Sequence, residues 1–244
     1  TYPSYWSLMN SVFHSSAYLE LWGYPELNPE SNFDVTLSWQ FHKNYSITAY
    51  YTILDKSMMQ LPYQPSERLA VIMQYINLNY NRNAGLVASA QWKLGNWANG
   101  NASAEVTYTH DKNDHFHDIP FNRERVSGRV SATASIRPFP KQNFRIILQP
   151  AYQLADIEGV YDVQPYFSLD ATLRWTDKSG KFTASLAGSN LTNNPFHAKD
   201  TWKGQNFTMR YFRDWANVTL SLIYKFGNYK EKDHKQVDTS RMGQ

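Results

Sequence analysis

The feature that most constrains the fold of this sequence is a strict alternation of apolar and polar residues between Val163 and Lys225. In the segment 167–175, every odd position is apolar, from Phe167 to Trp175, and every even position is polar. Side chains on a strand point alternately to opposite faces, so such a run has one apolar and one polar face. The alternation returns in 182–186 and 218–226. Full charges on the polar face, and an aromatic residue beside each tight turn on the apolar face, predict a β-barrel in a membrane.

The same period of two predicts further strands over 33–41, 45–53, 86–94, 102–108, 126–136 and 144–152. The span 69–94 is open to two interpretations: one long strand, or two strands joined near Asn79. We favour one long strand, because it keeps the up-and-down order and gives about nine crossings, the last nine of a larger barrel. We expect loops over 56–68, 110–123 and around 156–161. Pro150 cannot donate a ladder hydrogen bond, so we expect a bulge or weakened pairing there.

Charged residues avoid the apolar register of every predicted strand. A lysine or arginine facing lipid at mid-bilayer would cost about 2–4 kcal/mol, which explains such an exclusion. The charges on the other face would line a lumen, where they could contact a ligand or a plug, or could simply pair across neighbouring strands. The lumen candidates are Asp34, Glu105, Arg129, Asp170 and Arg174, accompanied by Arg137 and Arg145.

The predicted connections alternate between short turns and long polar loops, and aromatic residues recur beside the short turns. Amphipathic rings that gather at one end suit a membrane interface, and short periplasmic turns with long outer loops are typical of membrane barrels. The strands are also longer than the roughly 5–6 residues usual in globular proteins. We predict as interface residues Trp39, Tyr45, Trp92, Trp97, Phe144, Trp175, Phe182, Tyr224 and Phe226.

Composition agrees with a chain that exposes half of each strand to lipid. Aromatic residues make up 16% of the chain, and yet the mean hydropathy is −0.59. No run of about 18 apolar residues exists, which excludes a transmembrane helix. There is no cysteine, and a net charge of +3 is too small to indicate nucleic acid. The sequence begins at Thr1 without a signal peptide, so we expect it to be the C-terminal part of a longer exported protein.

Three regions are expected: an aromatic-rich extracellular loop region (1–31), transmembrane strands (32–226) and a periplasmic tail (227–244). The aromatic residues of 1–31 could stack on a sugar or a siderophore, or pack on one another, with at most a short strand near Tyr18–Trp22. One loop gathers residue types that suit a divalent cation, but a solvated outer loop is the favoured interpretation and we expect no metal site: His110, Asp111, Asp114, His115, His117 and Asp118. No catalytic arrangement, phosphate loop or zinc spacing is present, so we expect neither catalysis nor a cofactor.

Several segments resemble those of TonB-dependent receptors and related outer-membrane β-barrels. They are 3–10 (PSYWSLMN), 23–30 (GYPELNPE), 188–193 (GSNLTN), the closing strand 220–227 (LSLIYKFG) and the tail 229–244. Members of this family form barrels of roughly 22 strands with a plugged lumen. The resemblance implies that this chain is about the last two-fifths of such a barrel, and that its plug domain and N-terminal strands belong to a part that is missing here.

The resemblance implies a receptor in the outer membrane of a Gram-negative-type bacterium that takes up a siderophore, a glycan or a similar nutrient. Its partners would be outer-membrane lipid, a TonB-type energising complex and the barrel-assembly machinery, with no role for nucleic acid. One alternative is a passive or structural outer-membrane barrel without TonB coupling. A third hypothesis is a soluble lipocalin-like binding protein, in which the apolar face would line a core.

Overall fold

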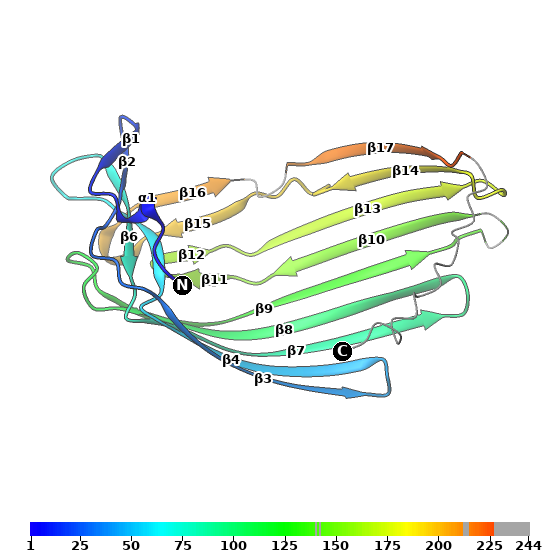
Figure 1. Ribbon diagram of the computed structural model, residues 1–244, viewed down its shortest axis with the longest axis horizontal. Helices are drawn as coiled ribbons and strands as arrows, with labels where there is room; N and C mark the ends of the chain where they lie inside the picture. Colours follow the sequence, from blue (N-terminus) through cyan, green and yellow to red (C-terminus); the bar gives the residue numbers. More distant parts are fainter. Residues whose placement is uncertain (140, 142, 212–214, 227–244) are drawn as a thin grey trace, which may run out of the picture.

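The computed structural model describes residues 1–139, 141, 143–211 and 215–226, and its main element is one nine-stranded sheet. Every pair of neighbouring strands in this large sheet is antiparallel, and the strands follow one another across it in chain order (Figure 1). Its strands are β3 (Ser31–Phe41), β4 (Tyr45–Asp55), β7 (Tyr80–Leu94), β8 (Ala98–Asn113), β9 (Phe121–Ile136), β10 (Phe144–Gln153), β13 (Tyr166–Thr176), β14 (Phe182–Ser189) and β17 (Asn217–Tyr224). The prediction of an antiparallel all-β fold is confirmed.

Two small four-stranded sheets lie at one end of the large sheet, which we call the loop end (Figure 1). The first contains β1 (Val12–Ser16), β2 (Leu19–Trp22), β6 (Val71–Asn77) and β5 (Met58–Tyr63), and its β2–β6 pair is parallel. The second contains β11 (Asp156–Glu158), β12 (Tyr161–Val163), β15 (Phe196–Asp200) and β16 (Phe207–Tyr211). The helices among the described residues are α1 (Tyr5–Leu8) and the 3-10 turn η1 (Trp202–Gly204), and neither is long enough to cross a membrane.

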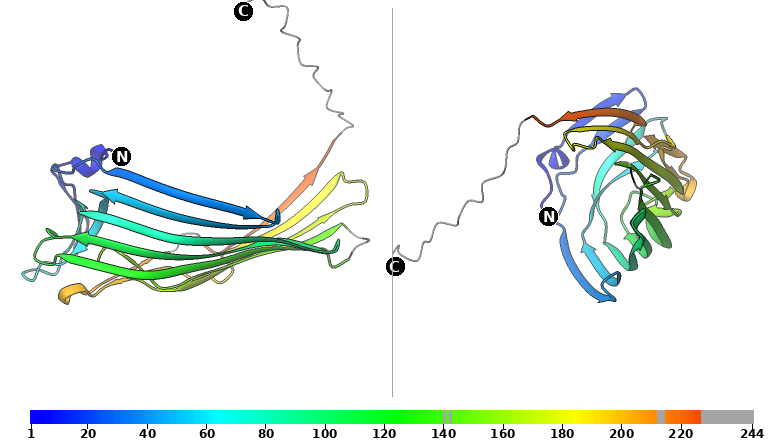
Figure 2. Two further views of the ribbon diagram at one scale, coloured as in Figure 1. Left: turned by 90° about the horizontal axis from the view of Figure 1, so that it is seen from below. Right: turned by 90° about the vertical axis from the view of Figure 1, so that its right-hand side faces the viewer.

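The large sheet is curved into an open trough, with β3 and β17 at its two edges (Figure 2). Each of these two strands pairs with a single neighbour among the described residues, so the described part of the chain does not close into a barrel. The expected total of about 22 strands therefore stays a prediction.

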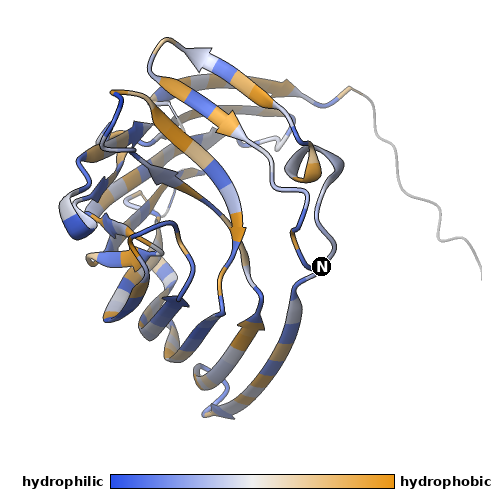
Figure 3. Ribbon diagram, turned by 90° about the vertical axis from the view of Figure 1, so that its left-hand side faces the viewer, coloured by the Kyte–Doolittle hydropathy of each residue, from blue (hydrophilic) through white to orange (hydrophobic). Residues whose placement is uncertain are grey.

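The apolar alternation is in register across the whole large sheet. Leu37 lies opposite Ala49, Ala49 opposite Leu86, and Leu86 opposite Val106, so apolar residues form continuous rows from strand to strand. Bands of apolar and polar residues follow one another along the strands (Figure 3). Leu37 and Leu220 are 73% and 65% exposed, so this face is not buried between two packed sheets. The arrangement contradicts the soluble alternative, which needs that face in a core.

The buried core lies at the loop end instead. Side chains from both small sheets, from the first residue of β9, from the β8–β9 loop and from two short connections pack together there: Leu61, Leu78, Phe116, Ile119, Phe121, Val160, Tyr161, Val163, Phe196 and Ala198. Burying an apolar side chain of this size contributes about 1.5–3 kcal/mol, so this cluster stabilises a folded cap on the large sheet. We call the two small sheets and this core the cap.

Several predicted boundaries differ from the structure. The favoured single strand over 69–94 is wrong: β6 and β7 are separate strands in different sheets, divided at Leu78, which is buried in the cap core. The predicted loop 110–123 is also too long, because β8 continues to Asn113 and β9 already begins at Phe121. In both places pairing with a neighbouring strand and packing in the cap override a weak sequence pattern.

The predicted loops contain most of the cap. The segment 1–31 holds α1, β1 and β2, and β3 already begins at Ser31; only the strand near Tyr18–Trp22 was expected. The predicted loops 56–68 and 156–161 contain β5, β11 and the start of β12, and the strands β15 and β16 were not predicted at all. These strands have three to six residues, too few for a period to be recognised. The tail 227–244 lies outside the described residues.

Pro150 has the predicted effect on pairing. The β9–β10 ladder records pairs on both sides of Gln149 and Pro150 but none at these two residues, and the register is the same before and after them. The pairing is therefore weakened without a bulge. On its other side, β10 pairs with β13 continuously through Pro150.

Candidate ligand-binding site

A polar recess lies on the polar face of the large sheet, next to the cap. It has a volume of about 500 Å³ and is lined by Arg129, Tyr166, Ser168, Asp170, Ser189, Asn190, Asn194, Phe196 and Asn217. A second hollow of about 320 Å³ shares three of these residues, namely Arg129, Tyr166 and Phe196. Arg129 and Tyr166 belong to the large sheet, whereas Phe196 belongs to the cap. The two hollows therefore lie side by side along the junction between the large sheet and the cap.

Strand alternation explains why polar side chains reach this recess. Ser168 and Asp170 follow one another on the polar face of β13, and Arg129 occupies the same face of β9. Asp170 accepts a hydrogen bond from the backbone N–H of Asn190 (2.7 Å), which fixes the start of the connection between β14 and β15. Guanidinium, carboxylate and amide groups around one hollow, with two aromatic rings, suit a polar ligand with an apolar part.

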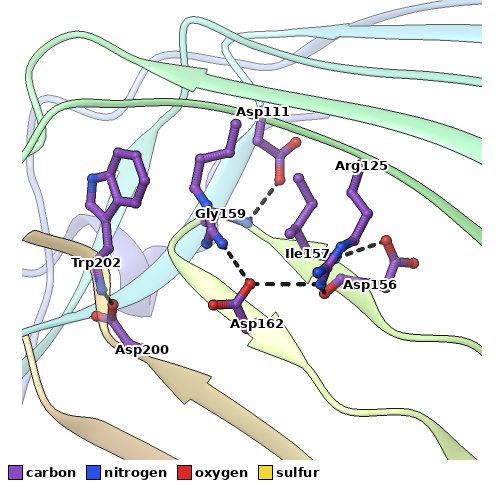
Figure 4. A network of polar contacts seen from close by, with 9 residues as sticks. Asp111, Arg125, Asp156, Ile157, Gly159, Asp162, Asp200 and Trp202 are labelled. Carbon is purple, nitrogen blue, oxygen red and sulfur yellow. Dashed lines mark hydrogen bonds and ion pairs between the residues drawn. The ribbon is translucent and has the colours of Figure 1, made fainter.

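The cap is joined to the large sheet by a network of charged residues (Figure 4). Arg123 of β9 donates from Nη2 to Asp162 Oδ1 of β12 (2.7 Å) and from Nη1 to the Gly159 carbonyl (3.1 Å). Arg125 lies beside the same carboxylate at 3.7 Å. The guanidinium of Arg123 also lies 5.2 Å from the ring centroid of Trp202, an arrangement that favours a cation–π interaction. These contacts join β12 and the β11–β12 turn of the cap to β9 of the large sheet.

Two buried carboxylates complete this network. Asp111 is 1% exposed and accepts hydrogen bonds from Asn81 Nδ2 (2.5 Å) and from the Gly159 N–H (2.8 Å). Asp200 is fully buried; its Oδ1 accepts from the Trp202 N–H at 2.9 Å, whereas Oδ2 has no hydrogen-bond partner among the described residues. Burial raises the pKa of Asp200 to about 6, despite the hydrogen bond from Trp202.

The structure brings together three of the five lumen candidates, because Glu105 of β8 lies directly opposite Arg129 of β9. Arg129 and Asp170 line the recess. Asp34 accepts hydrogen bonds from Asn32 Nδ2 (2.5 Å) and Thr52 Oγ1 (2.7 Å). Glu105 accepts from the Tyr50 hydroxyl (2.7 Å). The hydrogen-bond partners of these two carboxylates are uncharged side chains.

Arg174, the fifth candidate, lies far from the recess and directly opposite Arg145. Two like charges in one cross-strand pair destabilise a sheet. The pairing alternative expected opposite charges on neighbouring strands, and here the facing residues carry the same charge.

The histidine and aspartate residues of the segment 110–118 do not converge. His110 and Asp111 belong to β8, whereas His117 stacks on the Tyr63 ring with centroids 3.9 Å apart. Asp118 accepts from the Tyr63 hydroxyl at 2.9 Å. The described residues contain no group of three or more histidine, cysteine or carboxylate side chains that could hold a metal ion. Burial lowers the pKa of His117, which keeps its ring neutral near pH 7.

The nine predicted interface aromatics lie at the short-turn end of the large sheet, opposite the cap. They flank the connections 42–44, 95–97, 137–143 and 177–181 or end β17. Trp175 and Phe182 are in edge contact (6.0 Å), as are Tyr224 and Phe226 (4.7 Å), and Phe182 pairs with Tyr224. These contacts extend the aromatic belt across neighbouring strands. Its contact with a membrane interface stays a prediction.

Sequence reasoning missed the network around Arg123 and Asp162. It also missed the recess residues that follow β13 in the chain. One signal was available, because Arg123, Arg125 and Ser127 extend the polar positions of Arg129 upstream with the same period of two. Polar residues at the intervening positions Asn122 and Glu124 hid that strand. Asp162, Asp200 and Trp202 lie in the short cap strands or next to them, so no period marked them.

Comparison with known proteins identifies a matching family and a similar solved structure. The model of the outer membrane protein beta-barrel family matches residues 1–224. Among solved structures, the FrpB iron transporter from Neisseria meningitidis (F3-3 variant) is similar with a TM-score of 0.50 and 15% sequence identity. The alignment covers 81% of this chain and 31% of the transporter, so the chain spans about a third of that protein's length. No curated protein matches the chain.

The family match accounts for the two-faced sheet, in which exposed apolar rows on one side oppose charged residues on the other. It also locates the protein in the outer membrane, with lipid as the surroundings of the apolar face. The chain belongs to the outer membrane protein beta-barrel family.

Proposed function

We propose that the chain is the C-terminal part of an outer-membrane receptor barrel that takes up a nutrient, such as a siderophore or a glycan, with the help of a TonB-type energising complex. In this proposal the apolar face of the large sheet contacts lipid, the polar face lines the lumen, and the cap faces the outside of the cell. The barrel would bind and admit its ligand without catalysing a reaction.

The observation that carries this proposal is the combination of a lipid-compatible sheet with a folded cap over a polar recess. A barrel that only anchors or spans needs no packed core beyond its strands, whereas ten buried side chains form one here. The recess under this cap is lined by Arg129 and Asp170 from the sheet and by Phe196 from the cap. A ligand bound there would contact both parts at once, as uptake from outside requires.

The likeness to an iron transporter supports the barrel shape of this proposal. At 15% identity it supports the fold alone, and neither the ligand nor energy coupling follows from it. The second candidate, a passive barrel without TonB coupling, shares the same two-faced sheet. Growth on the nutrient in cells with and without the energising complex separates the two.

The lipid-facing register is tested by placing an arginine on each face of β13. Ala171 is on the apolar face and Thr172 is next to it on the polar face. We expect Ala171→Arg to block assembly, because an arginine in the hydrocarbon costs about 2–4 kcal/mol, while Thr172→Arg assembles normally. Heat-modifiable migration of the full-length protein extracted from outer membranes is the measurement. Equal assembly of the two variants would overturn the lumenal assignment.

A further inference from the structure

Basic side chains gather at the short turns, at the end of the large sheet opposite the cap (Figure 1). Each short turn has at least one of them in it or within two residues of it, and another follows the last residue of β17. All of these residues are exposed, and we call them the basic rim: Lys43, Lys93, Arg137, Lys178, Lys181 and Lys225. The rim therefore presents positive charge to whatever surrounds the turns.

Backbone hydrogen bonds link each short turn to the next across the sheet. An N–H donates to a carbonyl at 2.6–2.9 Å in four places: Gln91 to Asn44, Arg137 to Trp97, Thr176 to Asn143 and Lys225 to Lys181. The last of these bonds makes two lysines on neighbouring strands direct neighbours, and such strands are about 4.8 Å apart. The charges are thus held close together along one edge, so their fields add.

The basic rim has no counter-charge in the part of the chain that the structure describes. Asp177 is the one carboxylate in the described residues of the short turns, and it already accepts from the Ser179 hydroxyl and from the Phe182 N–H (2.9 Å). No rim residue forms an ion pair within 4.0 Å. The ion pairs of the described residues lie at the loop end, where for example Lys112 pairs with Asp114 (3.1 Å). Charge is therefore balanced at one end of the sheet and unbalanced at the other.

The rim lies at the same level as the aromatic belt. Lys181 directly precedes Phe182, and Lys225 lies between Tyr224 and Phe226, which are 51% and 87% exposed. Such rings suit the depth at which lipid headgroups lie. A lysine there can keep its methylene groups beside the rings while its ammonium group reaches the headgroups.

We propose that the basic rim binds the headgroups of anionic phospholipids in the leaflet beside the short turns, most strongly at Lys178, Lys181 and Lys225. A cluster of basic residues next to a membrane is attracted to anionic lipid, and the contributions of its members add. A soluble phosphate would gain little from exposed lysines, because salt screens such charges. A lipid is held by two parts at once, since its acyl chains contact the exposed apolar rows while its phosphate meets the rim.

This inference rests on the proposed function only for the leaflet, which is the periplasmic one in the proposed orientation. The test uses the full-length protein extracted from outer membranes. Native mass spectrometry measures the lipids bound from phosphatidylglycerol and from phosphatidylcholine with the same acyl chains. We expect about tenfold more adducts with the anionic lipid. Growth on a nutrient, which tests uptake, does not enter this measurement, so the two proposals can fail independently.

Lys178→Gln together with Lys181→Gln should lower the preference for phosphatidylglycerol about fivefold, because two of the clustered charges are lost. The Arg pair at the same positions should retain it. If the Gln pair does not assemble, Lys178→Gln alone, in an exposed turn, should lower the preference about twofold. The matched control, Lys56→Gln with Lys199→Gln, removes two exposed charges at the loop end and should leave the preference unchanged.

Three outcomes would overturn the inference. They are equal binding of the two lipids by the unchanged protein, a preference that the Gln pair in the rim leaves intact, and an equal loss in the loop-end control, which would indicate a general effect of net charge. Displacement of phosphatidylglycerol by an equal concentration of inorganic phosphate would also overturn it, because the rim would then bind a soluble ion instead of a lipid.

Discussion

At the scale of single residues, the polar face depends on close contact between a ring and a glycine. Gly85 of β7 lies opposite Tyr50 of β4, and a Cβ added at Gly85 would lie 2.5 Å from Cζ of the tyrosine ring. The Tyr50 hydroxyl donates to Glu105 Oε1 of β8 at 2.7 Å, so the ring crosses over β7 to reach the next strand. Alternation assigns Gly85 to a strand, but only the paired structure explains the absence of a side chain there.

Gly85→Ala should therefore destabilise the sheet. The added methyl group displaces the Tyr50 ring and lengthens its hydrogen bond to Glu105, at a cost typical of overpacking, about 1–3 kcal/mol. Urea unfolding of the full-length protein in detergent measures this cost. The same substitution in a Tyr50→Ala background, where no ring is displaced, should cost much less, and an equal cost in both backgrounds would contradict the explanation.

At the scale of elements, the cap depends on the fixed position of the β15–β16 hairpin. Asp200, the last residue of β15, is fully buried and also holds the Trp202 N–H. Trp202 in turn donates from Nε1 to the Pro120 carbonyl (3.3 Å), just before β9 begins. The side chain that ends one cap strand thus helps to join the cap to the large sheet.

This arrangement predicts a pH dependence of the cap. Burial raises the pKa of Asp200 from 3.8 to about 6, so the folded cap holds the proton more tightly than the unfolded chain does. The resulting stabilisation is complete below about pH 4 and is lost as pH rises through 6, by about 1–3 kcal/mol. Hydrogen exchange of Phe196–Asp200 amides, corrected for intrinsic rates, should show protection falling from pH 4 to pH 7. Asp200→Asn should abolish this slope, and a slope that persists in Asp200→Asn would assign the effect to another group.

At the scale of the whole molecule, the open trough leaves strand edges that a membrane does not tolerate. Among the described residues β3 and β17 each pair on one side only. Unpaired N–H and C=O groups in hydrocarbon cost several kcal/mol each, so in the proposed barrel these edges pair with further strands.

The 244-residue chain refolded alone in detergent should therefore form oligomers through these edges, while the full-length protein stays monomeric. Light scattering with detergent correction measures the mass of the assembled particle. Proline at Leu220 in β17 serves as the matched variant. The Lys225 N–H donates to the Lys181 carbonyl beside β14, so by alternation the Leu220 N–H points to the free edge, and a proline there removes an edge donor and should reduce the association. A chain that is monomeric without any substitution would contradict this prediction.

Whether a strand could be predicted from the sequence depends on its length. Long strands such as β3, β4 and β13, with eleven residues each, repeat the alternation often enough to be recognised from residue type alone. The cap strands β11 and β12, with three residues each, do not. The same limit explains the candidate site: Arg129 and Asp170 are on long strands and were predicted, whereas Asp162 and Asp200 are in the cap and were not.

The order of residue types along the chain fixes which face of each long strand is apolar, because side-chain direction on a strand follows from position alone. It also determined the end at which aromatic residues gather, since the turns that set this end are local. Three features emerge in the folded protein alone: β6 leaves the large sheet, the cap has its own core, and Arg145 faces Arg174. These features depend on which strands become neighbours, and residues far apart in the chain settle that choice through packing and charge.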